Sequence, residues 1–227
     1  MIATAREGDV CVVTLDRPGR RNALTLDALD ALETAVTSAD APVVSLRGAG
    51  SAFCAGADLD AVAGLPDREA AERFARRGQA VARAIETADP VVVAGVDGPA
   101  RGGGVELALA CDLRMATPEA TFAESGVTLG LLGAWGGTVR LPEVVGRGEA
   151  MDLALSGRVV DADAALRMGL VSRVVDDPGV VAREIASNDA GALRALKRRL
   201  RDDADRETRE RREAAAFADL HADFDRE

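Results

Sequence analysis

The chain has 227 residues, 48% of them hydrophobic, and a formal charge of −10 at pH 7. Its length and hydrophobic content predict one domain with a substantial core. The negative charge argues against nucleic acid as the main partner, because binding phosphates requires a basic face. The apolar runs are short and interrupted, so we expect no membrane span, and residues 1–10 lack the basic-then-apolar layout of a signal peptide. These features predict a cytoplasmic protein.

Side chains that bind metals or form disulfides are few and scattered. Cys11, Cys54 and Cys111 lie inside or beside apolar sequence, which predicts buried thiols in a reducing compartment. Their spacing offers no zinc site. His221, near the C-terminus, is expected to be a surface side chain.

The first predicted elements are a strand, a helix and a second strand. A β-branched run at residues 10–15 predicts a half-buried strand, and a turn follows at residues 17–19. Thr25 is typical of an N-cap, and leucines at helical spacing predict a helix that ends before Asp40. The apolar residues 43–47 then predict a strand.

The rest of the chain continues the alternation of strands and helices, which predicts an α/β domain. From Pro178 onward the sequence is helical in pattern, so we divide the chain into a core at residues 1–177 and a helical region at residues 178–227. The further strands are expected at residues 91–96, 113–116 and 170–175, and the further helices at residues 67–88, 105–110, 136–140, 148–155 and 161–167.

Two loops rich in small residues follow two of the predicted strands. SAFCAGAD occupies residues 51–58, and three consecutive glycines at residues 102–104 open the helix that contains Glu106. A helix start carries unpaired N–H groups and partial positive charge, so it can hold a ligand oxygen that becomes negative. The alternative is an ordinary tight connection with a glutamate favoured by the helix dipole. Two loops of one kind could meet over one ligand.

Four ordered motifs resemble the enoyl-CoA hydratase/isomerase family, also called the crotonase superfamily. They are RPGRRNAL at residues 17–24, GAGSAFCAGADL at 48–59, GPARGGGVELALACDLRMA at 98–116 and LGLLGAWGGTVRLPEVVG at 129–146. The resemblance implies a crotonase-like spiral of β-β-α units, with C-terminal helices used for oligomerisation in trimers or dimers of trimers. It also implies an acyl-CoA thioester substrate, with coenzyme A as part of that substrate and no tightly bound cofactor.

The resemblance also implies roles for individual residues. Backbone N–H groups of Ala57 and Gly103 would hold the thioester oxygen, and Glu106 would be the general acid or base. We interpret Asp58 and Asp112 as loop-bracing carboxylates and Trp135 mainly as a packing residue. The segments expected to bind substrate contain Arg20, Arg21, Ala23, Ala55, Gly56, Ala57, Asp58, Gly102, Gly103, Gly126 and Trp135.

The sequence departs from the family pattern at Gly126, where hydratases have a second glutamate. Glu124 lies two residues earlier; a loop could bring it inward, but we expect it to face solvent or form a salt bridge. Hydration is therefore expected to be weak. The family also usually continues beyond residue 227, often with a basic residue near the CoA phosphates.

Three interpretations follow from the sequence. The first is an enzyme of the enoyl-CoA hydratase/isomerase type that stabilises an enolate and uses Glu106. The second is a malonyl-type acyl-CoA decarboxylase, and the third is a non-catalytic acyl-CoA-binding subunit. The glycines and Glu106 favour catalysis, whereas Gly126 and the short C-terminal region favour binding alone.

Overall fold

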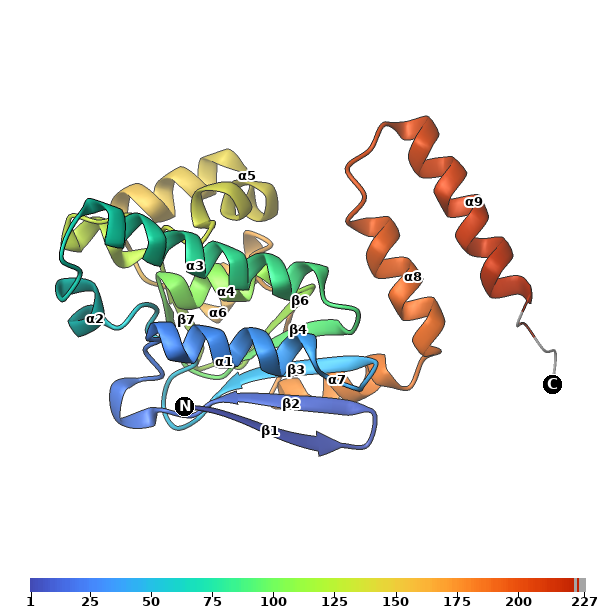
Figure 1. Cartoon of the computed structure of the whole chain (residues 1–227), viewed down its shortest axis with the longest axis horizontal. Coiled ribbons are helices and arrows are strands. Elements are labelled where there is room, and N and C mark those ends of the chain that lie inside the picture. Colours follow the sequence, from blue (N-terminus) through green and yellow to red (C-terminus); the bar gives the residue numbers. More distant parts are fainter. Residues whose placement is uncertain (223, 225–227) are drawn as a thin grey trace.

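The computed structural model describes residues 1–222 and 224, and it confirms the predicted α/β class. Its larger sheet has the strand order β1-β2-β3-β4-β6-β9 (Figure 1). Strand β1 pairs antiparallel with β2, and the other pairs of this sheet are parallel. The strands are β1 (Ile2–Glu7), β2 (Val10–Leu15), β3 (Val43–Gly48), β4 (Val91–Val96), β6 (Leu113–Ala116) and β9 (Arg173–Val174).

Strand β1 was missed by the sequence prediction. Its sequence is IATARE, and all of its residues after Ile2 are exposed. A strand at the edge of a sheet that buries neither face lacks the apolar alternation by which strands are recognised. The predicted strand at residues 170–175 is reduced to the two residues of β9.

Helices cover both faces of the larger sheet. On one face lie α1 (Leu26–Thr37) and α3 (Arg68–Thr87), which run side by side (Figure 1). The Thr25 hydroxyl accepts a hydrogen bond from the Ala28 N–H group, which confirms the predicted N-cap. On the other face, α7 (Pro178–Ala186) buries its apolar side chains against the valines of β2, β3 and β4. Two short helical turns, η1 (Pro18–Arg20) and α2 (Leu59–Ala63), lie in the connections before α1 and α3.

The central strand and the helix after it form the middle of the molecule. Every residue of β4 is buried, and α4 (Gly103–Ala110) is buried from Gly104 to its end. The helix begins within the glycine run, two residues earlier than predicted. A second sheet, with the order β5-β7-β8, lies beside this helix and contains β5 (Pro99–Arg101), β7 (Thr121–Ala123) and β8 (Val160–Asp161).

The segment after β7 is a short helix, a loop and a long helix. The helices are η2 (Ser125–Leu129) and α5 (Gly137–Ser156), followed by α6 (Ala162–Arg167). Helix α5 combines the two helices predicted at residues 136–140 and 148–155. Gly146 breaks its regular backbone, with a φ of 78° that favours glycine.

The last two helices, α8 (Ala190–Leu200) and α9 (Arg206–Ala222), project away from the body of the molecule (Figure 1). Lys197 attaches α8 to the sheet, because its ammonium group donates to the Pro90 carbonyl (2.8 Å) and lies 2.9 Å from the Asp112 carboxylate. Asp112 also accepts from the Val92 N–H group, which agrees with its interpretation as a bracing carboxylate. The predicted division between residues 1–177 and 178–227 stays a prediction. Helix α7 belongs to the second part, but it packs on the sheet of the first. Among the described residues, no helix is both long and apolar enough to cross a membrane.

Candidate active site

The two small-residue loops meet at the start of α4. Arg101 donates its N–H to the Cys54 carbonyl (2.9 Å), and Cys54 forms an isolated bridge with Ala100. A Cβ atom at Gly56, whose φ is 86°, would lie 2.9 Å from the Gly103 nitrogen. Only glycine permits this approach, which brings residues 54–58 against the helix start.

The backbone N–H groups of Ala57 and Gly103 lie at this contact and have no acceptor among the described residues. Several neighbouring N–H groups are used: Ala55 donates to Arg21, Asp58 to Leu24 and Gly102 to Ala123. Gly103 is the first residue of α4, so its N–H has no partner within the helix. The fold therefore leaves free the two donors that the family resemblance implies for an oxyanion.

Glu106 lies in the first turn of α4 and is 2% exposed. Its Oε1 atom accepts hydrogen bonds from the N–H groups of Trp135 (2.8 Å) and Gly137 (2.6 Å). Burial raises the pKa of Glu106, while the bonds from Gly137 and Trp135 oppose that rise by stabilising the ionised form. The carboxylate therefore caps the N-terminus of α5.

The expectation that Glu124 faces solvent or forms a salt bridge was wrong. Glu124 is 7% exposed, and its Oε1 atom is buried without a hydrogen-bond partner in the described part of the chain. Burial, and then the charge of Glu106, raise the pKa of Glu124 to about 8. Glu124 lies between β7 and η2, and its side chain points inward, toward Gly133.

The carboxyl groups of Glu106 and Glu124 converge on Gly133. A Cβ atom at Gly133 would lie 3.0 Å from Glu106 Oε1 and 3.0 Å from Glu124 Oε2. Those two oxygens are therefore no farther apart than twice that distance. Gly133 could not be identified from the sequence, because its importance depends on two side chains distant from it along the chain.

Gly126 is closely covered by the loop between η2 and α5. A Cβ atom there would lie 3.2 Å from the Leu132 carbonyl carbon and 3.3 Å from the Leu131 oxygen. A side chain at this position would require that loop to move. The backbone at residue 126 thus follows a path that suits glycine.

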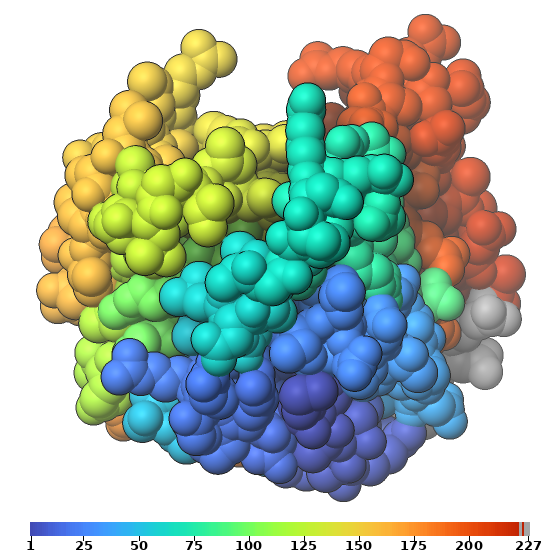
Figure 2. Space-filling view, turned by 60° about the vertical axis from the view of Figure 1, so that its left-hand side comes forward, coloured from blue at the N-terminus to red at the C-terminus, as the bar shows by residue number. Residues whose placement is uncertain are grey.

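Trp135 is 2% exposed and fills the space between α3 and α4, which confirms its interpretation as a packing residue. Its ring occupies the positions where side chains at Gly78 and Gly103 would lie, and its centroid is 6.0 Å from that of Phe74. Figure 2 shows this side of the molecule, with the start of α3 in teal beside the yellow-green segment that contains η2. A glycine inside a helix, such as Gly78, was a usable signal for such close packing.

The arginines of the first motif are largely engaged by neighbouring acids. Arg17 donates to Asp58 (2.5 Å), and Arg20 pairs with Asp58 and Asp60. The bond from Arg17 lowers the pKa of Asp58, which also caps α2. Arg21 is exposed and forms no ion pair with the described residues. The Ala23 carbonyl accepts from Arg17 (3.2 Å), so these residues form a braced turn beside the 54–58 loop.

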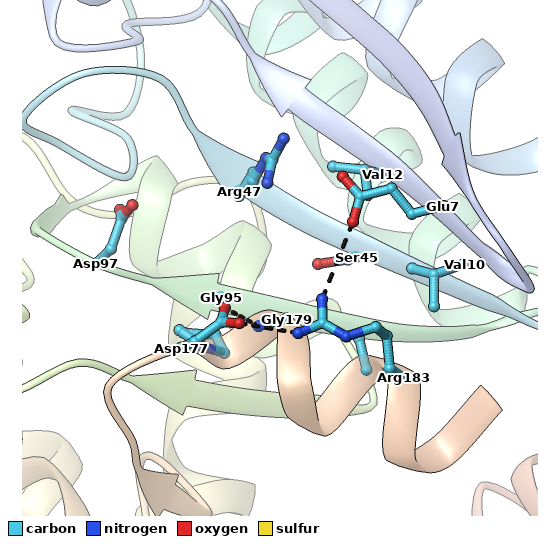
Figure 3. A pocket seen from close by; sticks show the side chains of 12 residues that line it. Glu7, Val10, Val12, Ser45, Arg47, Gly95, Asp97, Asp177, Gly179 and Arg183 are labelled. Carbon is cyan, nitrogen blue, oxygen red and sulfur yellow. Dashed lines mark hydrogen bonds and ion pairs between the residues drawn. The ribbon is translucent and has the colours of Figure 1, made fainter. Parts of the chain in front are cut away.

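A cavity of about 600 Å³ lies between η2 and α5, and Glu124 forms part of its wall. The rest of its lining is mostly apolar and includes Val127, Leu131 and Leu141. A smaller cleft of about 220 Å³ lies at the start of α7 and contains none of the predicted site residues (Figure 3). Its charged groups include Arg183, which pairs with Asp177.

Comparison with known proteins shows the family of the chain. A model of the family described as enoyl-CoA hydratase/isomerase matches residues 5–226. The chain belongs to the enoyl-CoA hydratase/isomerase family. It is 42% identical over 179 residues to crotonyl-CoA hydratase of Syntrophomonas wolfei, a match that covers 77% of this chain and 68% of that protein.

Solved structures of this enoyl-CoA hydratase/isomerase family share the fold. The enoyl-CoA hydratase of Thermoplasma volcanium superposes with a TM-score of 0.91 at 33% identity, over 98% of this chain and 92% of that one. A Thermobifida fusca protein in complex with CoA gives a TM-score of 0.87 at 29% identity, over 98% and 93% of the two chains. The crotonase fold is thus established for this member of the family.

Proposed function

We propose that the chain is an acyl-CoA enzyme of the hydratase/isomerase type that holds the thioester oxygen between the N–H groups of Ala57 and Gly103. The observation that carries this proposal is the pair of unused donors where the two loops meet. Such donors are fixed before reaction and do not titrate. Each contributes roughly 3–4 kcal/mol to a transition state in which the oxygen becomes negative.

Glu106 is the general base in this proposal. The Trp135 and Gly137 N–H groups favour its ionised form, which can accept a proton from water or from a carbon beside the thioester. It lies one turn along α4 from Gly103, so an oxygen at the helix start has this carboxylate on its side of the helix.

The cavity beside Glu124 supports an acyl substrate, because its lining is mostly apolar. The relative from Syntrophomonas wolfei is named for crotonyl-CoA, which supports a short enoyl thioester, and the CoA complex of the Thermobifida fusca protein supports the CoA part. Coenzyme A enters as part of the substrate, with no tightly bound cofactor. We include cytoplasmic location and a homotrimer or dimer of trimers in the proposal. Exposed Leu200 and Phe217 on α8 and α9 support assembly through these helices.

The test is turnover of a panel of enoyl-, hydroxyacyl- and malonyl-type CoA thioesters. We expect hydration of a short enoyl-CoA, measured as loss of absorbance of the conjugated thioester. Carbon dioxide release from a malonyl thioester without hydration would instead identify a decarboxylase. Tight binding of thioesters without turnover would identify a non-catalytic subunit.

A further inference from the structure

We infer that Glu124 is the second carboxylate of the reaction and supplies a proton. Glu124 directly follows β7, whereas the family pattern has its second glutamate two residues later, at the position of Gly126. The inference rests on the proposed function and adds a catalytic residue to it. It follows from the meeting of Glu106 and Glu124 at Gly133 and from the unpaired state of the Glu124 oxygen.

No hydrogen bond among the described residues explains why the Glu124 carboxyl group is buried. A buried carboxyl group without a partner is unfavourable for folding, and most such groups in proteins are hydrogen-bonded. Glu124 braces no loop and caps no helix, whereas Glu106 does both at the start of α5. An unpaired group at the wall of an apolar cavity is instead available to a ligand.

The environments of the two carboxyl groups favour an ionised Glu106 and a protonated Glu124. Glu106 receives two N–H bonds, so the negative charge belongs on it. Glu124 receives none and lies beside that charge, so it keeps its proton at neutral pH. The other charged group that lines its cavity is Arg147 of α5, and Arg140 of the same helix is held by Glu86.

This division of charge suits addition of water to an enoyl thioester. Glu106 accepts a proton from water as the water oxygen bonds to C3, and the C2=C3 electron pair moves to form the enolate. The enolate then takes the proton of Glu124 at C2. Glu106 is left protonated and Glu124 ionised, and proton transfer from Glu106 to Glu124 restores the starting state.

The test compares Glu124→Gln with Glu119→Gln, an exposed glutamate just before β7. With the enoyl-CoA that the wild type hydrates best, we expect Glu124→Gln to lower kcat by roughly 10²-fold or more. Binding of the corresponding saturated acyl-CoA should be unchanged. Wild-type kcat should fall as the pH rises past about 8, where Glu124 loses its proton, and this fall should be absent from the residual activity of Glu124→Gln. Glu119→Gln should match the wild type.

A second variant tests the geometry without changing either carboxyl group. Gly133→Ala places a methyl group 3.0 Å from both carboxylate oxygens and should abolish hydration. Gly148→Ala is its control, because no atom lies within 4 Å of a Cβ there. Should Glu124→Gln fail to fold, the wild-type pH profile and Gly133→Ala decide the question.

The outcomes separate the two proposals. A wild type that neither binds nor turns over any thioester overturns the proposed function. A wild type that hydrates enoyl-CoA while Glu124→Gln retains its rate overturns only the role of Glu124. A slower Glu124→Gln protein whose pH profile equals that of the wild type also overturns it, since Glu124 would then act only through structure.

Discussion

Gly56 lies against the backbone nitrogen of Gly103, with only 2.9 Å between that nitrogen and the position of a Cβ atom at Gly56. This contact joins two loops that are distant in the sequence, and the N–H groups of Ala57 and Gly103 in these loops have no acceptor among the described residues. Because the donors are backbone groups, their placement depends on how closely the two chains approach.

Replacement of Gly103 by alanine should lower turnover by at least roughly 10²-fold, the effect of losing one oxyanion donor. The new methyl group would run into the ring of Trp135, so either the ring or the start of α4 must shift. Trp135 is the only tryptophan in the chain, and its fluorescence reports that shift directly. Gly148→Ala should leave turnover unchanged. Normal kinetics in a folded Gly103→Ala protein would remove this site from the proposal.

Two substitutions at Glu106 should separate its chemical and structural roles. Glu106→Gln keeps an oxygen that can accept from Trp135 and Gly137, so the fold should persist while the rate falls roughly 10²- to 10⁴-fold. Glu106→Ala leaves both N–H groups without an acceptor and should also lower the free energy of unfolding by about 1–3 kcal/mol. Steady-state kinetics and urea unfolding measure the two effects. A wild-type rate in Glu106→Gln would make Glu106 a helix cap alone.

Glu124 should make stability fall as the pH rises. Its pKa is about 8 in the folded protein, above the ordinary glutamate value of 4.5, so the folded state binds more protons between these two pH values. The contribution of Glu124 to stability is fully present below the pKa that the group has in the unfolded chain. It is lost as the pH rises through the pKa of the folded protein. Between about pH 5 and about pH 8, the wild type should lose at least about 1.4 kcal/mol relative to Glu124→Gln, the equivalent of one pKa unit.

Urea unfolding at the two pH values measures this difference, and Glu119→Gln is the exposed control. Glu106→Gln should weaken the dependence, because the charge of Glu106 contributes to the raised pKa of Glu124. Equal pH dependence in the wild type and Glu124→Gln would contradict the raised pKa.

Lys197 should be important for the attachment of α8. Lys197→Met keeps the apolar stem but leaves the Pro90 carbonyl without its donor and should cost about 1–3 kcal/mol of stability. Arg194→Met, at an exposed position of the same helix, is the control. Lys197 is also the only lysine, so slow reaction with an amine-selective reagent in the folded protein, measured by mass spectrometry, reports its burial. Equal stability of the two variants would contradict this role.

Most elements of the core could be predicted because their signals are local. The cap at Thr25 and the apolar runs of β3 and β4 depend on residues within one turn or one strand. Strand β1 could not be found this way, since it is exposed and exists through its pairing with β2. The family and both small-residue loops likewise followed from short motifs.

The direction of the Glu124 side chain could not be predicted from residues 122–126. It depends on the loop at residues 131–133, which covers Gly126 and places Gly133 between the two carboxyl groups. Trp135 lies just after this loop, and its ring packs against Gly78 of α3. Its N–H group donates to Glu106, so one short segment links the packing of α3 to the position of Glu106.

The sequence by itself determined the α/β class, the family, the two glycine-rich loops and the place of Glu106 at a helix start, because each is written in contiguous residues. Only the tertiary structure decided that Glu124 faces Glu106, that Trp135 fills the space left by Gly78 and Gly103, and that Lys197 joins α8 to the sheet. These relationships connect groups far apart in the chain. Their partners come together only when burial of the core brings separate elements into contact, and it is this burial that removes water from the carboxyl groups and raises the pKa of Glu124.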